Sequence, residues 1–194
     1  MRIQNLLLIT GNPGKAEEFK ELIDIKELNF SHRSLDLPEI QSFEIEDIAR
    51  YKTQAALNIL SEGFEYDAVL TDDTGLYCEG LNGLPGPFIK WFLDKLNAEG
   101  LHNLVKNGNT NTKAVCLLSL GVIKSSEIVQ FNGTVPGRLT EPKGSGGFGW
   151  DAAFVPDGQS KTYGEMTEEE KNKISHRTLA VKQFRNWLLE DDNL

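Results

Sequence analysis

The 194-residue sequence contains little cysteine. Cys78 and Cys116 are its only two cysteines, and neither belongs to a CxxC pair or lies near a group of histidines. This usage argues against a disulfide framework and against a structural zinc site. Free thiols fit a reducing compartment, so the sequence predicts a cytoplasmic protein.

Long hydrophobic runs are also absent. No stretch approaches the roughly 20 apolar residues that a membrane span requires, and the first apolar run, residues 6–9, is shorter than the roughly seven residues of a signal-peptide core. Hydrophobic residues make up 39% and charged residues 25% of the chain, as in ordinary globular proteins. We therefore expect no membrane association.

Basic residues are in deficit. The chain has 20 Lys and Arg against 29 Asp and Glu, which gives a formal net charge of −9. Non-specific nucleic-acid binding depends on clustered basic residues, so we expect no nucleic-acid partner. A small phosphate-bearing ligand is still compatible, because a few lysines and a metal ion can reverse the local charge.

Strand and helix patterns alternate along the chain without an internal repeat or a linker. Apolar or alternating segments predict strands at residues 6–9, 28–35, 68–71, 113–120 and 127–135. The strand at 68–71 is expected to end at the acidic turn of residues 72–75. We expect one α/β domain over residues 1–194, a mixed twisted sheet with flanking helices and two lobes around a central cleft.

The first candidate for chemistry is the turn Thr10-Gly11-Asn12-Pro13-Gly14-Lys15, between a predicted strand and a predicted helix. Backbone amides at such a helix start bind anions, and a lysine adds a positive charge. The motif lacks Walker spacing, because Ala16 stands where Ser or Thr is required. By itself it also fits an ordinary turn with a solvated lysine.

Adjacent carboxylates form the second candidate. Asp72 and Asp73 follow a buried strand, and Glu39 follows a Leu-Pro turn. Carboxylates beside phosphate are the ligands that Mg²⁺ prefers, although neighbouring strand residues point to opposite faces and only one would enter the cleft. A β-turn or a helix cap explains the acidic pair equally well.

Three glycine-rich or basic segments complete the candidates. Residues 80–91 present Lys90 between apolar neighbours, residues 146–151 combine glycines with two aromatic rings and a carboxylate, and residues 170–177 end in two basic side chains. Each also has a purely structural interpretation: a lysine reaching out to water, a tryptophan anchoring its loop, and a solvated basic turn.

Together these segments resemble the inosine triphosphate pyrophosphatase, or Ham1-like, family. The sequences TGNPGK, LDLPE, DDTGL, GLPGPFIKWF, FGWDAAFVPDG and EKNKISHR occur in the family's order over nearly the whole chain, and GLPGPFIKWF is similar to the eukaryotic branch. The resemblance implies hydrolysis of ITP, dITP and XTP to the monophosphate and pyrophosphate, with Mg²⁺ or Mn²⁺ as cofactor. It also implies a cytoplasmic homodimer that removes deaminated purines from the nucleotide pool.

The same resemblance assigns roles to individual residues. Metal binding falls to Glu39 and Asp73, and catalysis to Asp73, Asp72 and Lys15. Asp73 is expected to orient the attacking water, with Asp72 or Glu39 as proton acceptor. The implied substrate-binding residues are Thr10, Gly11, Asn12, Pro13, Gly14, Lys15, Lys52, Asp73, Thr74, Lys90, Phe148, Gly149, Trp150, Asp151, Lys171, His176 and Arg177.

Within that set, Lys52, Lys90 and Lys171 are expected around the triphosphate, and residues 148–151 around the nucleoside. Arg177 can donate to the 6-oxo group of hypoxanthine or xanthine, whereas the 6-amino group of adenine offers donors where an acceptor is needed. Two alternatives compete: a phosphotransferase, or a non-catalytic nucleotide-binding module that uses the TGNPGK loop. Ala16 counts against the first, and the three carboxylates count against the second.

Overall fold

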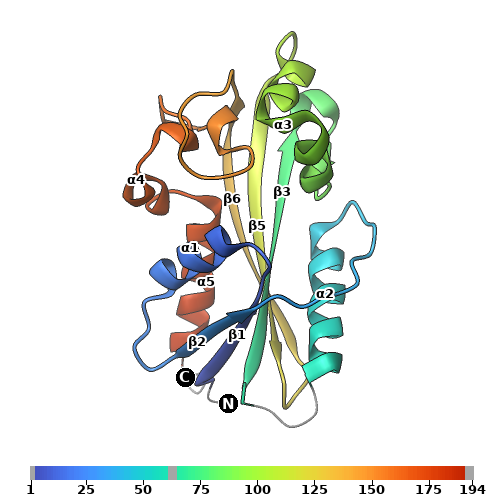
Figure 1. Ribbon diagram of the computed structural model, residues 1–194, viewed down its shortest axis with the longest axis vertical. Coiled ribbons are helices and arrows are strands. Elements are labelled where there is room, and N and C mark those ends of the chain that lie inside the picture. The colour runs from blue at the N-terminus through green and yellow to red at the C-terminus, as the bar shows by residue number, and fades with distance from the viewer. Residues whose placement is uncertain (1–2, 61–64, 191–194) are drawn as a thin grey trace. The chain divides into compact units, whose positions relative to one another are not determined.

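The computed structural model describes residues 3–60 and 65–190, and it contains one mixed sheet with helices on its faces (Figure 1). Strands lie in the order β2-β1-β3-β5-β6-β7, and β4 pairs with β3. The helices and strands are β1 (Asn5–Ile9), α1 (Pro13–Ile23), β2 (Asn29–Arg33), α2 (Ile45–Leu60), β3 (Ala68–Cys78), β4 (Pro85–Gly86), α3 (Ile89–Val105), β5 (Asn111–Val122), β6 (Ile128–Leu139), β7 (Phe154–Pro156), α4 (Glu168–Asn172) and α5 (His176–Leu189).

Both strand orientations occur in the sheet. β1 pairs in parallel with β2 and with β3, whereas β4 runs antiparallel to β3 and β7 antiparallel to β6. Parallel neighbours need a crossover, and the helices α1 and α2 lie in the two connections. The predicted mixed α/β fold is confirmed.

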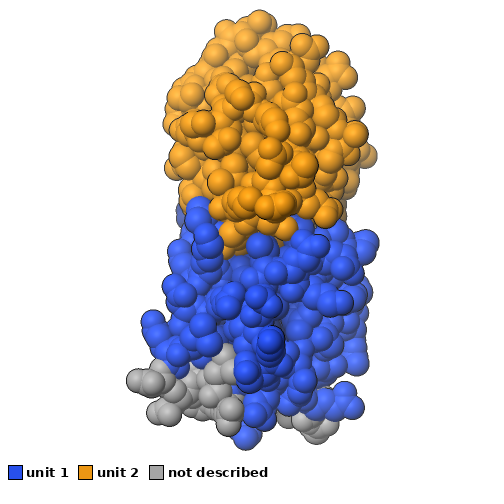
Figure 2. Space-filling view, turned by 90° about the vertical axis from the view of Figure 1, so that its left-hand side faces the viewer, with its two compact units in different colours: residues 1–73, 117–132, 179–194 blue, residues 74–116, 133–178 orange. Residues whose placement is uncertain are grey.

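The chain divides into two compact units (Figure 2). Unit 1 comprises the described residues of 1–73, 117–132 and 179–194, and unit 2 comprises residues 74–116 and 133–178. The boundary after residue 73 falls inside β3, so this strand contributes to both units.

In unit 1, α1 and α5 lie on one side of β1 and β2, and α2 lies on the other (Figure 1). The α2 side is an apolar cluster in which Ala56 and Leu57 pack with Leu7, Ile9 and Val69. On the α1 side, the ring of Phe19 stacks on Phe30 at 5.4 Å and lies 6.2 Å from Phe184 of α5. Both faces are covered, which explains why the strand at residues 6–9 is a continuous apolar run.

The prediction that the third strand ends at residues 72–75 is wrong, because β3 continues through the acidic pair to Cys78. Leu76 is fully buried and pairs with Gly86 of β4, so pairing beyond the acidic residues prolongs the strand. The turn and helix-cap interpretations of Asp72 and Asp73 fail for the same reason.

Unit 2 has its own core, built around aromatic side chains. Trp150, Phe154 and Tyr163 are buried there with Leu101 and Val105 of α3. α3 contains a kink at Asn97 (φ 55°, ψ −173°), which divides it into two helical segments. No helix in residues 3–60 and 65–190 has the length and hydrophobicity needed to cross a membrane.

Candidate active site

The loop between β1 and α1 is fixed by its own hydrogen bonds. Thr10 Oγ1 accepts from the Asn12 amide at 3.1 Å, and Asn12 Oδ1 accepts from the Lys15 amide at 3.3 Å. Asn12 is thus the N-cap of α1, and Pro13 begins the helix, where its missing N–H costs nothing. The result is a preformed helix start of the kind that binds phosphate.

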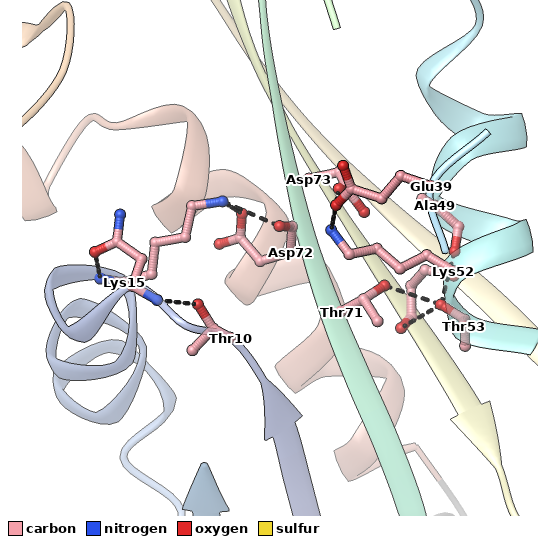
Figure 3. A network of polar contacts seen from close by, with 11 residues as sticks. Thr10, Lys15, Glu39, Ala49, Lys52, Thr53, Thr71, Asp72 and Asp73 are labelled. Carbon is pink, nitrogen blue, oxygen red and sulfur yellow. Dashed lines mark hydrogen bonds and ion pairs between the residues drawn. The ribbon is translucent and has the colours of Figure 1, made fainter. Parts of the chain in front are cut away.

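The side chain of Lys15 is held by Asp72. Its Nζ donates to Asp72 Oδ1 at 2.7 Å and to the Asp72 carbonyl oxygen at 3.0 Å (Figure 3). The Asp72 side chain is 1% exposed and that of Lys15 is 17% exposed. A lysine has three donors, so two are used on Asp72.

The second carboxylate of the pair faces the other side of β3. Figure 3 shows Asp72 and Asp73 on opposite sides of the strand, as the alternation of strand residues requires. Asp73 Oδ1 and Glu39 Oε1 each lie 2.8 Å from Nζ of Lys52, which comes from α2. Glu39, Lys52 and Asp73 therefore form one ionic cluster.

The environment of Lys52 keeps it charged. Burial alone would lower the pKa of Lys52, but the ion pairs and hydrogen bonds with Asp73 and Glu39 outweigh burial and raise that pKa well above its usual range. The ammonium group of Lys52 is thus present at any physiological pH.

The carboxylates of this cluster fit a divalent cation that also binds phosphate. Among the described residues, no group of three His, Cys, Asp or Glu side chains converges on one point. However, Mg²⁺ is commonly held by one or two carboxylates together with waters and substrate phosphates. Asp73 Oδ2 is buried and has no hydrogen-bond partner, so one acceptor of the pair is available for a cation.

A second polar cluster lies in unit 2, around Phe148. Asp151 Oδ2 accepts from the Phe148 amide at 2.8 Å and from Lys171 Nζ at 2.9 Å. The Lys171 ammonium lies 5.0 Å and the Arg177 guanidinium 5.7 Å from the centroid of the Phe148 ring. The ring itself is 37% exposed, so one aromatic surface is presented among buried cations.

Gly147 allows the Phe148 loop to close on Asp151. Its φ is 70°, and a Cβ at this position would lie 2.1 Å from Asp151 Oδ2. Only glycine satisfies both the backbone conformation and the close approach.

The structure places the remaining predicted residues of unit 2 in distinct surroundings. Trp150 is 5% exposed and belongs to the core, with its ring 5.2 Å from His176, which agrees with the anchoring interpretation. His176 and Arg177 are almost fully buried, so a solvated basic turn is excluded. Lys171, which is expected beside the triphosphate, is ion-paired with Asp151.

Three further predicted residues also belong to unit 2. Thr74 continues β3 directly after Asp73, and Gly149 has a φ of 65° in the Phe148 loop. Lys90 is exposed, with its Nζ 5.3 Å from the centroid of its neighbour Trp91, as expected for a lysine reaching out to water.

Sequence reasoning missed two features near these clusters. Tyr163 stacks on His176 with ring centroids 6.2 Å apart, and nothing in the local sequence indicates this contact. Thr53 is fully buried directly after Lys52. Its position four residues after Ala49 and three before Ala56 places it on the buried stripe of α2, and that spacing is a signal the sequence did offer.

Comparison with known proteins identifies the family. The Ham1 family profile matches residues 6–187. The chain belongs to the Ham1 family. This Ham1-family chain is 35% identical over 192 residues to a Schizosaccharomyces pombe protein named inosine triphosphate pyrophosphatase, with 98% of each chain covered. It is 37% identical over 184 residues to a Methanopyrus kandleri protein named dITP/XTP pyrophosphatase, and this alignment covers 94% of this chain and 95% of the relative.

Solved Ham1 structures share the fold. The Ham1 protein of Staphylococcus aureus has a TM-score of 0.77 at 26% identity, covering 95% of this chain and 98% of that one. The HAM1 protein of Coxiella burnetii has a TM-score of 0.75 at 25% identity, covering 96% of this chain and 99% of the other. The mixed sheet of this Ham1-family chain is therefore that of its relatives.

Proposed function

We propose that this chain is a pyrophosphohydrolase that converts ITP, dITP and XTP to the nucleoside monophosphate and pyrophosphate, and so removes deaminated purines from the nucleotide pool. The observation that carries the proposal is the acidic pair of β3, in which each carboxylate binds its own lysine. The names of the relatives support the substrate class. Two cations, two carboxylates and a helix N-terminus within unit 1 suit a polyphosphate with a metal ion.

The phosphate chain would bind at the start of α1. The amide of Gly14 in its first turn and the remaining donor of Lys15 offer hydrogen bonds to phosphate oxygens. Asp72 is assigned to positioning Lys15 rather than to accepting a proton, because its carboxylate is buried and already accepts from that ammonium group. Removing Asp72 would therefore act through Lys15.

Glu39 and Asp73 would hold Mg²⁺ or Mn²⁺. Such an ion, when bound, supplies positive charge that stabilises the phosphate oxygens and the leaving pyrophosphate. Asp73 contributes its unpartnered Oδ2 to orienting water and cation. The sequence left Asp72 and Glu39 as candidate proton acceptors. Glu39 is the better placed of the two, because 48% of its side chain is exposed.

The base would bind in unit 2 beside the exposed ring of Phe148. Lys171 and Arg177 are buried donors, so the cluster favours carbonyl oxygens of hypoxanthine and xanthine over the 6-amino group of adenine. We assign Lys171 to this base-binding cluster, because its ammonium binds Asp151 and lies 5.0 Å from the centroid of the Phe148 ring.

The two units would be the two lobes of a single domain. A cytoplasmic homodimer without nucleic-acid or membrane partners is part of the same proposal, and the family resemblance and the net charge of −9 support it.

Product analysis tests the function. With Mg²⁺, the purified protein should release pyrophosphate from ITP, dITP and XTP at least about a hundredfold faster than from ATP. Asp73→Asn should reduce turnover by about a thousandfold or more in a protein that still unfolds cooperatively in urea. Glu169→Gln, which changes an exposed carboxylate on α4, is the matched control and should retain full activity. Orthophosphate as the first product, or equal rates on all purines, contradicts the proposal.

A further inference from the structure

Three hydroxyl residues are buried between α2 and the sheet in unit 1. Thr53 of α2, Thr71 of β3 and Ser119 of β5 all have no exposed surface. Their neighbours are apolar: Ala49 packs with Leu117, and Ala56 with Val69. A buried hydroxyl is unfavourable unless it is hydrogen-bonded, so its partners show what it does.

Thr53 connects α2 to β3. Its Oγ1 donates to the Ala49 carbonyl at 2.8 Å and lies 2.9 Å from Thr71 Oγ1. A hydroxyl both donates and accepts, and either of the two can be the donor in this contact. The contact is a direct side-chain link between the two elements, in addition to their apolar packing.

Helix α2 also lies unusually close to β5 at this point. A Cβ on Gly121 would lie 2.8 Å from Thr53 Cγ2 and 2.9 Å from Leu57 Cγ. The missing side chain of Gly121 therefore lets the helix approach the sheet, and Thr53 Oγ1 reaches to 3.4 Å from the Ser119 carbonyl oxygen. Apolar contacts set this distance, but they are non-directional and tolerate sliding along the strand.

The Thr53–Thr71 link runs beside the Lys52–Asp73 ion pair. Lys52 immediately precedes Thr53 on α2, and Asp73 follows Thr71 by two residues, so both lie on the same face of β3. Figure 3 shows the two contacts between the same two elements. The hydroxyl link is buried, whereas the Lys52 and Asp73 side chains are 16% and 13% exposed.

We propose that Thr53 and Thr71 are positioning residues, whose hydrogen bond holds α2 at the register on β3 that places the Lys52 ammonium between Asp73 and Glu39. The inference rests on the proposed function only where activity is the readout. The alternative is that the two threonines contribute to stability alone.

The first test is kinetic. Thr53→Val and Thr71→Val each remove one hydroxyl at nearly constant side-chain shape. Each change is made in the wild type and in the Lys52→Met variant, and kcat/KM for pyrophosphate release from ITP is measured for every protein. Each change should lower kcat/KM by about tenfold in the wild type and by less than about twofold beside Lys52→Met, because the positioned group is then absent. Equal losses in both backgrounds would overturn the inference, and so would full activity of both Val variants.

Two sets of variants control this test. Thr53→Ser and Thr71→Ser keep the hydroxyl and should restore kcat/KM to within about threefold of the wild type. Ser119→Ala removes a hydroxyl from the same buried region, but Ser119 Oγ has no hydrogen-bond partner, so activity should be unchanged. Failure of both Ser variants to restore activity contradicts a role for the hydroxyl link.

The second test does not use activity, so it separates this inference from the proposed function. Amine acylation at mildly alkaline pH is followed by peptide mass spectrometry, because only the neutral amine reacts. Thr53→Val should raise the rate at Lys52 by about fivefold or more, since its ion pairs loosen. The rate at Lys171, whose side chain is 6% exposed and lies in unit 2, should stay constant. Parallel increases at both lysines would indicate general loosening and would refute positioning.

Discussion

The pair of Lys15 and Asp72 gives the sharpest prediction about how the phosphate loop is built. Asp72→Asn removes the charge from a side chain that is 1% exposed and leaves the Lys15 ammonium with a neutral partner. Breaking a buried ion pair from one side costs roughly 3–5 kcal/mol. Because Lys15 is 17% exposed and can reach water, we expect about 3 kcal/mol, at the lower end of that range.

The assay is urea unfolding of the wild type, Asp72→Asn, Lys15→Met and the double variant. Lys15→Met leaves the Asp72 carboxylate buried without its cation and should cost a similar amount. The double variant removes both charges, so it should lose clearly less than the sum of the single losses, with a coupling energy of at least about 1.5 kcal/mol.

An exposed ion pair provides the matched control. Glu169 of α4 and Lys173, the C-cap of that helix, are 2.6 Å apart with side chains 82% and 66% exposed, and the losses of their single variants should simply add. The reasoning is refuted if the Lys15 and Asp72 losses add within about 0.5 kcal/mol. The KM for ITP should also rise in Asp72→Asn, because the third donor of Lys15 is no longer aimed at the phosphates.

Three further predictions concern other contacts. Burial raises the pKa of Asp67, but hydrogen bonds from the N–H groups of Gln4 and Asn5 outweigh it and lower that pKa. Asp67→Asn should therefore lower the free energy of unfolding by about 1 kcal/mol at neutral pH, and this loss should vanish as the pH falls through the lowered pKa. A loss that is the same at every pH would contradict the assignment. Gly147→Ala should raise the KM for ITP by about tenfold or more, because the new Cβ would collide with Asp151. Gly158 also has a positive φ, 76°, but open space around it, so Gly158→Ala should change only the stability. Equal effects of the two variants on KM would contradict the role given to Gly147. Arg177→Gln should reduce the preference for ITP over ATP by about tenfold, measured as the ratio of kcat/KM values, and an unchanged ratio would exclude the base contact.

The fold was largely predictable from local patterns. Buried strands appear as short apolar runs, as in residues 6–9, and helix starts carry their caps, as Thr167 does with Glu170 before α4. The end of β3 was not predictable, because its continuation through two carboxylates depends on pairing with β4, which is a tertiary contact.

The residues of the site were easier to predict from the sequence than the contacts among them. Alternation along a strand correctly separates Asp72 from Asp73. The sequence does not show that Asp72 binds Lys15, nor that Lys171 binds Asp151, because both contacts join segments far apart in the chain. Ion-pair partners of this kind depend on the packed structure.

Hydrolysis of ITP in ¹⁸O-labelled water tests the central claim most directly. Attack on the α-phosphorus, as the account predicts, places the label in inosine monophosphate and leaves the released pyrophosphate unlabelled. Label in pyrophosphate or in orthophosphate, with unlabelled monophosphate or diphosphate, would contradict the account.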